Sequence, residues 1–390
     1  MKFQEVQNKD KAYIASTYNR FGVAIEKGNG ATFIDVEGKK YIDFTSGIGV
    51  NAFGVNDELW KKAVVEQVNA VQHACNLYYT LPQIRLAELL CEKSGAKKVF
   101  FGNSGAEANE CAIKVARKYS ALKYGDLVRY EIVTLKESFH GRTLATLSAT
   151  GQNHFHHYFG PFPDGFVYAE PNMDSVKACV GEKTCAVMVE LIQGESGVNV
   201  LDKTFVVELA KYCKEKDILL IVDEVQTGNG RTGNVYAFQG FGIEPDVVTT
   251  AKGLGGGLPI GACMLFEKTE NVFAYGDHGT TYGGNPVACA GAVSVMERMT
   301  ESLLKEVNEK GEYLKEKIKK MPNVAGVDGM GLMIGVRLKG ERTARQVAEE
   351  CLKKGLLVLT AHEKVRLLPP LNITKREIDE GLNVLKEVLK

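Results

Sequence analysis

The sequence predicts an α/β fold, with a large unit built on a mostly parallel sheet between helices and a smaller α+β unit beside it. Short strand-like runs alternate with stretches of helical spacing through the middle of the chain, which is typical of parallel strands joined by helical crossovers. Several of these runs are apolar at consecutive positions, as expected for strands covered on both faces. After Pro286 the alternation stops, which indicates a second unit.

The predicted strands of the central part are Lys97–Gly102, Glu131–Leu135, Cys185–Glu190, Ile218–Val222, Asp246–Thr250 and Gly261–Phe266. Five other stretches have the apolar spacing of helices. They are Glu107–Lys123, Lys203–Lys216, a long stretch from Pro286 to about Lys320, Arg342–Lys354 and Thr374–Lys390. Gly331–Leu338 is a further predicted strand, in the carboxyl-terminal part.

The chain divides into three predicted parts. Its 390 residues exceed one small core, so two structural units are expected. Residues 56–285 form the large domain and residues 286–390 the small domain. Residues 1–55 carry strand-like runs at Ala31–Asp35 and Lys40–Phe44, and we expect this segment to pack with the small domain.

The composition is that of an ordinary globular protein, with 45% hydrophobic and 25% charged residues and a net charge of zero. Balanced charge gives no reason to expect binding to nucleic acid or to an anionic membrane. The amino terminus lacks the apolar stretch of a signal peptide, and no apolar run approaches a membrane span. The nine cysteines are scattered and form no Cys-x-x-Cys, so we expect a reduced, cytoplasmic protein.

Two residues suggest pyridoxal 5′-phosphate chemistry. Lys252 lies in Thr-Ala-Lys-Gly-Leu-Gly-Gly-Gly, and Asp223 ends the apolar run that begins at Ile218. Enzymes that use this cofactor need a lysine amine for its aldehyde and a carboxylate for its ring nitrogen. Either residue alone is more simply a surface lysine beside a glycine turn or an acid at a strand end. The pair, together with the turn described next, favours the cofactor.

A predicted strand–turn–helix junction supplies the phosphate site. Ser104 follows a glycine after the first central strand and is a natural N-cap for the helix that comes next. The amides of Gly105 and Ala106 then lie at the helix start, where unpaired N–H groups and the helix dipole favour an anion. By itself the segment fits an ordinary capped helix, and the distant lysine tips the balance toward phosphate.

Two other motifs suggest other ligands, and we expect neither ligand. Gly228–Gly233 fits G-x-G-x-x-G, but the segment after it is a poor helix and the first glycine lies several residues beyond the strand. His154, His156 and His157 are close together in a polar aromatic loop, without acidic or cysteine partners nearby. A metal site needs a closed ligand set, so no metal is predicted.

Taken together, the motifs resemble those of the class III aminotransferases, which have the fold of type I pyridoxal phosphate enzymes. The matching stretches run in the family's order along almost the whole chain. They are Asn103–Asn109, Ser138–Thr143, Val189–Glu195, Asp223–Gly233, Pro245–Asp246, Lys252–Gly253, His278–Pro286 and Val365–Pro370. The chain departs from the family's common Glu-Pro-Ile-Gln-Gly-Glu-Gly-Gly at Leu191 and at Ser196–Gly197, and from its amino-terminal Gly-His-x-His-Pro at Gly54–Asp57.

The resemblance implies a role for each residue around the cofactor. Lys252 would form the Schiff base and then move the proton, and Asp223 would keep the ring nitrogen protonated. Gln226 would hydrogen-bond the phenolic oxygen, while Phe139 and Val225 would contact opposite faces of the ring. Ser104, Gly105 and Ala106 would hold the phosphate. Thr281 would reach the phosphate of a neighbouring subunit, which implies a homodimer with the active site at its interface.

The resemblance also assigns the substrate contacts. Arg142 would bind the distal carboxylate of both substrates and Arg366 the proximal carboxylate of 2-oxoglutarate, since guanidinium grips carboxylate bidentately. Glu195 would pair with Arg366 while the amino donor is bound and swing away for 2-oxoglutarate.

Within the family, Asn76–Thr80, Gly47–Ala52 and the compact length are most similar to the members that use N2-acetylornithine as donor. N-succinyl-diaminopimelate, ornithine and 4-aminobutyrate stay open as alternative donors, with Asn76 and Tyr18 as candidates for recognising the acyl group. A decarboxylase or aminomutase on the same fold, or a non-catalytic relative, is a less favoured hypothesis.

Overall fold

The computed structural model describes all 390 residues, and its largest sheet has seven strands in the order β4-β12-β11-β10-β7-β5-β6. The strands are β4 (Lys98–Gly102), β12 (Gly261–Leu265), β11 (Val247–Thr250), β10 (Leu219–Asp223), β7 (Thr184–Val189), β5 (Glu131–Leu135) and β6 (Phe166–Ala169). All neighbours from β11 to β6 are parallel, whereas β12 is antiparallel to both β11 and β4. The prediction of a mostly parallel sheet in an α/β fold is confirmed.

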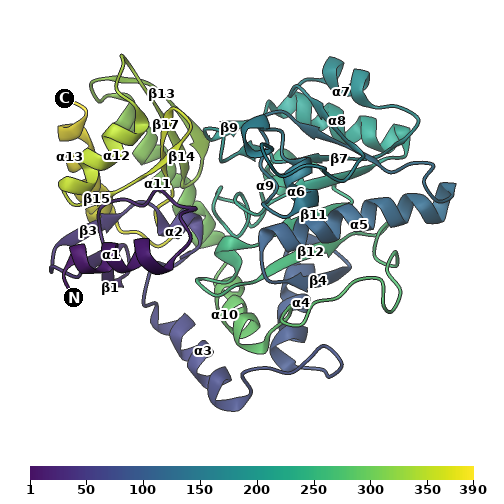
Figure 1. The fold of residues 1–390 in the computed structure, drawn as a ribbon, viewed down its shortest axis with the longest axis horizontal. Coiled ribbons are helices and arrows are strands. Elements are labelled where there is room, and N and C mark those ends of the chain that lie inside the picture. Colours follow the sequence, from purple (N-terminus) through teal and green to yellow (C-terminus); the bar gives the residue numbers. More distant parts are fainter.

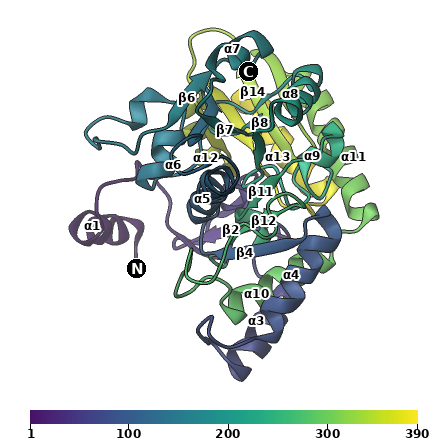
Figure 2. The ribbon, with the colours of Figure 1, turned by 90° about the vertical axis from the view of Figure 1, so that its right-hand side faces the viewer.

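Apolar residues on both faces of the sheet explain why its strands lack polar alternation. Every residue of β7, β10, β11 and β12 is buried. In β10, Leu219 and Ile221 belong to one hydrophobic cluster, together with residues of α5 (Gly105–Tyr124), while Leu220 and Val222 belong to another, with residues of α8 (Lys203–Lys216). Helices therefore cover the sheet on both sides, as Figures 1 and 2 show.

The amino-terminal strands share a sheet with the carboxyl-terminal part of the chain. This sheet has the order β1-β2-β3-β15, and β15 is parallel to β3. A second four-stranded sheet has the order β13-β14-β17-β16. In Figure 1 the purple amino-terminal and yellow carboxyl-terminal segments lie together on one side of the molecule. The strands are β1 (Ile25–Asn29), β2 (Thr32–Asp35), β3 (Lys40–Asp43), β13 (Val324–Met330), β14 (Met333–Leu338), β15 (Leu356–Leu357), β16 (Leu359–Ala361) and β17 (Lys364–Leu367).

The long helix predicted after Pro286 is two helices, and that prediction was wrong in this respect. The helix α10 (Pro286–Glu297) packs against α3 (Glu58–Ala70) and α4 (Leu81–Ser94), whereas α11 (Glu301–Lys319) packs against β13. Between them Thr300 caps the second helix, because its hydroxyl accepts a hydrogen bond from the Leu303 N–H. No glycine or proline marks this break, so helical spacing alone did not reveal it.

The remaining elements are short or lie at the edges of the fold. They are α1 (Phe3–Tyr13), α2 (Ser46–Gly49), α6 (Leu144–Ala149), α7 (Met173–Cys179), β8 (Ile192–Gln193), β9 (Asn199–Val200), α9 (Ala237–Phe241), α12 (Ala344–Lys353) and α13 (Lys375–Val388). Among all the helices, none combines the length and the apolar character that a membrane crossing requires.

Candidate active site

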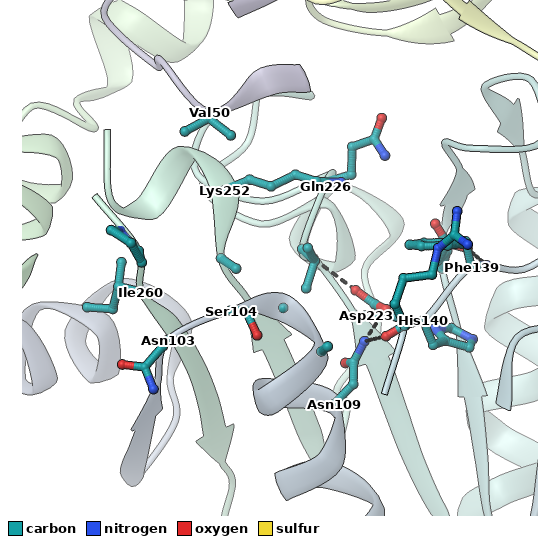
Figure 3. Close-up of a pocket in the computed structure, with 18 of the residues that line it drawn as sticks. Val50, Asn103, Ser104, Asn109, Phe139, His140, Asp223, Gln226, Lys252 and Ile260 are labelled. Atoms are coloured by element: carbon teal, nitrogen blue, oxygen red, sulfur yellow. Dashed lines mark hydrogen bonds and ion pairs between the residues drawn. The ribbon is translucent and has the colours of Figure 1, made fainter. Parts of the chain in front are cut away.

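A cavity of about 430 Å³ lies where the loops after β4, β5, β10 and β11 converge. Ligand sites of open α/β sheets form at the carboxyl ends of parallel strands, because the connecting loops diverge there. The cavity is large enough for a small cofactor and substrate. Among its lining residues are nine that the sequence predicted: Ser104, Gly105, Ala106, Phe139, Arg142, Asp223, Val225, Gln226 and Lys252. Figure 3 shows the arrangement.

Lys252 enters the cavity from a strained backbone position after β11. Its φ of 46° lies in the left-handed region, which a residue other than glycine adopts only where the surrounding structure enforces it. Asn229 supplies such support, since its side-chain amide donates to the Ala251 carbonyl at 3.0 Å and to the Thr250 hydroxyl at 2.8 Å. Burial, and then the charge of Arg366, lower the pKa of Lys252. A larger share of neutral amine suits a lysine that attacks an aldehyde.

Asp223 is fixed by three hydrogen-bond donors at the end of β10. Its carboxylate accepts from the Asn109 amide at 2.8 Å and from the Val225 N–H at 3.0 Å, and His140 Nδ1 lies 2.8 Å away. A carboxylate only accepts, so Nδ1 carries the proton in this contact. Asn109 is held in turn by the Thr249 hydroxyl, which donates to it at 2.6 Å. Sequence analysis assigned no role to Asn109 or His140, although both lie within its matching motifs, because only the fold brings them to Asp223.

The turn after β4 leaves two backbone amides free at the start of α5. Ser104 caps this helix by accepting from the Glu107 N–H at 3.1 Å. The N–H groups of Gly105 and Ala106 come before the first intrahelical acceptor and line the cavity. A Cβ at position 105 would lie 2.6 Å from a methyl carbon of Val225, so only glycine fits between the turn and that side chain. The turn therefore offers an anion site closed on one side by Val225.

A buried carboxylate supports the loop that carries Phe139. Glu190 accepts from the Phe139 N–H at 2.8 Å and from the Gly194 N–H at 3.4 Å. Burial raises the pKa of Glu190 to about 7. No role was predicted for Glu190, beside which Leu191 replaces the family's proline. The structure places Glu190 in the cavity wall, between the loop of Phe139 and the segment that leads to Glu195.

Arg366, on β17, points toward Glu195 and Gln226, next to the cavity. Its Nη1 donates to the Gly194 carbonyl at 2.9 Å, to Glu195 Oε2 at 3.1 Å and to Gln226 Oε1 at 3.2 Å. The Arg366 side chain is 3% exposed, whereas that of Glu195 is 38% exposed. The buried Arg366 Nε has no hydrogen-bond partner. The ion pair therefore joins a fixed cation to an anion that has access to solvent.

Arg142 lies at the exposed rim of the cavity and pairs with no carboxylate. Its guanidinium carbon is 4.0 Å from the centre of the Phe155 ring and 5.5 Å from that of Phe139. Sequence analysis did not select Phe155.

Five predicted residues do not line this cavity: Arg366 and Glu195 lie beside it, and Asn76, Thr281 and Tyr18 lie elsewhere. Asn76 donates to the Gly283 carbonyl at 2.8 Å and to the Thr280 carbonyl at 3.2 Å, so it joins the loop that carries Thr281. Thr281 itself is exposed, and Tyr18 is 74% exposed. The predicted roles of Asn76, Thr281 and Tyr18 stay predictions.

The two competing motifs have structural partners of their own. In Gly228–Gly233, Arg231 donates to the carbonyls of Leu332 and Pro369, so the segment ties β10 to the carboxyl-terminal part of the chain. No helix begins at Gly233, unlike in a dinucleotide site. The loop after α6 that holds His154, His156 and His157 is the histidine-rich loop. In it, His156 Nε2 lies 2.8 Å from the Leu147 carbonyl and 2.9 Å from that of Thr150.

The cavity fits pyridoxal phosphate in three respects. The free amides at the start of α5 suit the phosphate, and the carboxylate of Asp223 suits a protonated ring nitrogen. Lys252 has no carboxylate as partner, because Asp223 contacts His140 and Glu195 pairs with Arg366. Its amine is therefore available to the aldehyde.

Comparison with known proteins agrees with this fit. The aminotransferase class-III family profile matches residues 13–389. The chain is 48% identical to the acetylornithine aminotransferase of Haemophilus ducreyi, over 100% of this chain and 99% of that protein. An ornithine aminotransferase of Toxoplasma gondii, crystallised with pyridoxal phosphate at partial occupancy, superposes with a TM-score of 0.94 at 28% identity, over 99% of this chain and 94% of the other. The N-acetylornithine aminotransferase of Stenotrophomonas maltophilia gives a TM-score of 0.84 at 33% identity, with 98% of each chain covered. The chain therefore belongs to the class III aminotransferases, a family of pyridoxal phosphate enzymes.

Proposed function

We propose that this enzyme transfers the δ-amino group of N2-acetylornithine to 2-oxoglutarate in a ping-pong cycle. The products are N-acetylglutamate 5-semialdehyde and glutamate, and the reaction serves arginine biosynthesis. One observation carries the proposal: of the two guanidinium groups at this site, one is free and the other is covered by an acid. An amino donor with one distant carboxylate needs one arginine, and a dicarboxylic keto acid needs both.

The residues around the cofactor divide the work of proton transfer. The bound cofactor supplies the ring that withdraws electrons from the reacting carbon. Lys252 would take the proton from that carbon and return it to the former aldehyde carbon of the cofactor, and its lowered pKa favours the neutral amine that this requires. Asp223, held by Asn109 and His140, keeps a proton on the ring nitrogen. Gln226 uses its Oε1 toward Arg366, which leaves its amide N–H groups for the phenolic oxygen.

Glu195 decides which substrate fits. While it pairs with Arg366, the proximal side of the site offers no free cation, so a donor without a proximal carboxylate binds. When 2-oxoglutarate enters, its second carboxylate replaces Glu195 on Arg366, and the half-exposed Glu195 moves toward solvent. Arg142 holds the distal carboxylate in both half-reactions. Ser196, beside Glu195, accepts a hydrogen bond from the Asn199 amide at 3.3 Å and so belongs to the β8–β9 hairpin.

The working unit in this proposal is a homodimer. In the loop before α4 and at the first residue of α4, the chain exposes Leu77, Tyr78, Tyr79 and Leu81, with 70% or more of each residue accessible. Such a contiguous apolar patch marks an interaction surface, and the Asn76 contacts bring the loop of Thr281 beside it. In the dimer Thr281 would reach the phosphate of the other subunit. Light scattering after gel filtration checks this, and a monomeric holoenzyme would contradict it.

We expect the enzyme to act in the cytoplasm. All nine cysteines are free in the structure, in keeping with a reduced compartment.

The amino donor is the point on which related enzymes of the family differ. Asn76 and Tyr18 are proposed to recognise the acyl group across the subunit interface. N-succinyl-diaminopimelate, ornithine and 4-aminobutyrate are the alternative donors. Ornithine and 4-aminobutyrate present a terminal amine and a distant carboxylate, whereas the free amine of N-succinyl-diaminopimelate lies beside a carboxylate.

A half-reaction followed by cofactor absorbance tests the proposal. The holoenzyme is mixed with each of the four donors separately, without keto acid. We expect rapid conversion of the pyridoxal form to the pyridoxamine form with N2-acetylornithine and slower conversion with the others. Faster conversion by another donor would overturn the substrate and leave the mechanism intact. A protein that shows no cofactor absorbance after pyridoxal phosphate is added would overturn the proposal as a whole.

A further inference from the structure

Arg142 is held by the face of its guanidinium, without any hydrogen bond from its N–H groups. Its guanidinium carbon lies 4.0 Å from the centre of the Phe155 ring and 5.5 Å from that of Phe139, and no carboxylate lies within ion-pair distance. A cation above an aromatic ring is attracted by the negative face of the ring. The N–H donors point outward in the guanidinium plane, so this contact leaves them free for a carboxylate.

Phe155 occupies a well-supported place in the histidine-rich loop. Its ring meets Phe139 edge to face at 5.7 Å, and the His154 ring lies 3.9 Å from it. The loop is anchored beside it by His156, whose Nε2 lies within hydrogen-bond distance of two backbone carbonyls of residues 147 and 150. Phe155 is half-buried, whereas Phe159 in the same loop is 56% exposed and stacks on no ring. The loop therefore places the ring of Phe155, and not that of Phe159, against Arg142.

A second anchor ties this loop to the carboxyl-terminal part of the chain. The Gln152 amide donates to the Ser138 carbonyl at 3.0 Å, which fixes its orientation and leaves Oε1 to face His362 Nε2, also at 3.0 Å. A side-chain carbonyl only accepts, so His362 Nε2 is the donor. The His362 ring in turn lies 6.0 Å from that of His154. His362, between β16 and β17, therefore supports the loop of Phe155 through Gln152 and His154.

An aromatic support has an advantage over an acidic one at this position. A carboxylate partner would fix Arg142 through the same N–H groups that a substrate carboxylate needs, and the two would compete. An exposed arginine without any support would sample many rotamers, and ordering it on binding costs free energy. Stacking orders the side chain beforehand and keeps its donors free.

We propose that Phe155 is a specificity-determining positioning residue, which holds Arg142 ready for the distal carboxylate of the substrate. This inference rests on the proposed function, because it takes Arg142 as the carboxylate-binding group. It gives the histidine-rich loop a task that is neither metal binding nor acid–base chemistry.

The test compares two donors that differ only in the carboxylate. N2-acetylornithine has it, and N-acetyl-1,4-diaminobutane lacks it. In the holoenzyme, Phe155→Leu is expected to raise the KM for N2-acetylornithine roughly three- to tenfold, in line with a lost cation–π contact. Its kcat and its activity on the amine without carboxylate stay unchanged. Phe155→Tyr keeps the ring face and behaves as the wild type, and so does the matched control Phe159→Leu.

Several outcomes would overturn the inference. A wild-type KM in Phe155→Leu would do so, as would equal losses on both donors, which would mean that the ring supports the cavity in general. Phe155→Met, whose unbranched and flexible side chain adapts to irregular space, provides a second non-aromatic variant in case Phe155→Leu does not fold. In an Arg142→Ala background, Phe155→Leu is expected to add no further rise in KM, and an additive rise would count against the inference. If the wild-type protein itself showed no preference for the donor with a carboxylate, the proposed function would fail instead.

Discussion

The two arginines at the active site are held in opposite ways. Arg366 is buried, and its Nη1 is already bonded to Gly194, Glu195 and Gln226, whereas its Nε has no partner. Arg142 is exposed, and two aromatic rings support its face while its N–H groups remain unbonded. One cation is thus always ready for a carboxylate, and the other is ready only after an acid leaves it. In the proposed cycle this difference lets one site serve a donor with one carboxylate and an acceptor with two.

The supports of the two arginines also differ in how freely they move. In the proposed cycle Arg366 would keep its contacts with the Gly194 carbonyl and with Gln226 after Glu195 departs, so the cation itself would not need to move. Glu195 belongs to the short β8–β9 hairpin and has 38% of its side chain exposed. Water can stabilise the carboxylate of Glu195 after it leaves, whereas the buried Arg366 needs a new anion in its place. In the proposed cycle the carboxylate of 2-oxoglutarate would supply that anion.

The largest effect is expected from Lys252, the reacting group of the cavity. Lys252→Ala removes the amine that moves the proton, so both half-reactions should fall by about 10³-fold or more. Both arginines remain, and dicarboxylates should still bind. Single-turnover absorbance measures the rates, and calorimetry with glutarate measures the binding. Turnover at the wild-type rate would refute the role of Lys252, and loss of glutarate binding would mean that the lysine shapes the arginine sites as well.

The next effect separates the two arginines directly. Arg142→Ala is expected to raise the KM for both the amino donor and 2-oxoglutarate by about 30-fold, because a charge-assisted contact is lost in each half-reaction. Arg366→Ala should raise the KM for 2-oxoglutarate by a similar factor and leave the donor's KM nearly unchanged.

Steady-state kinetics with each substrate varied in turn gives the four values. Arg366→Ala also leaves Glu195 without its cation, so its Tm should fall more than that of Arg142→Ala, whose parent side chain has no ion pair to lose. Equal effects of the two substitutions on both substrates would remove the distinction between the arginines.

The sequence predicted the residues expected to hold the cofactor better than the residues that hold the two arginines in place. Asp223, Lys252 and the turn at Ser104 follow strands of the sheet, and strand ends were visible as boundaries of apolar runs. Parallel strands bring such ends to one edge, so spacing along the chain was enough to group them. The largely parallel sheet followed from the same runs, although the antiparallel direction of β12 left no mark in its composition.

The residues that sequence analysis missed act through contacts between distant segments. Asn109 and His140 meet at Asp223 only after α5 and the loop after β5 have packed together. Phe155 had no signal beyond an aromatic residue among histidines, because a cation–π contact has no fixed spacing along a chain. Glu190 stood in a matching motif, but its two N–H donors come from loops that the sequence does not bring together.

A smaller effect is expected when the charge of Glu195 is removed. Glu195→Gln leaves Arg366 without a competing anion, so the KM for 2-oxoglutarate should fall about fivefold, the scale of a partly exposed ion pair. Glutamate, which also carries a proximal carboxylate, should improve as a donor relative to N2-acetylornithine by a similar factor. Half-reaction rates with the two donors measure this. An unchanged ratio of the two rates would show that Glu195 does not control access to Arg366.

The smallest effect is expected at Glu190, which contacts a residue beside each of the two arginines. It accepts from the N–H of Phe139, whose ring contacts Arg142, and from the N–H of Gly194, whose carbonyl accepts from Arg366. Burial raises its pKa from an ordinary 4.5 to about 7, so the native state holds this proton more tightly than the unfolded chain does. Its contribution to stability is present below about pH 4.5 and is lost as the pH rises through 7.

Glu190→Gln removes the titration, so the drop in unfolding free energy between pH 5.5 and 8 should shrink by on the order of 1 kcal/mol. Part of the drop should persist, because burial also raises the pKa of Glu224 to about 7. Denaturant unfolding at the two pH values measures the change, with the exposed Glu182→Gln as control. A drop as large as in the wild type would mean that Glu190 is already ionised at pH 5.5, and that its two N–H donors outweigh the cost of its burial.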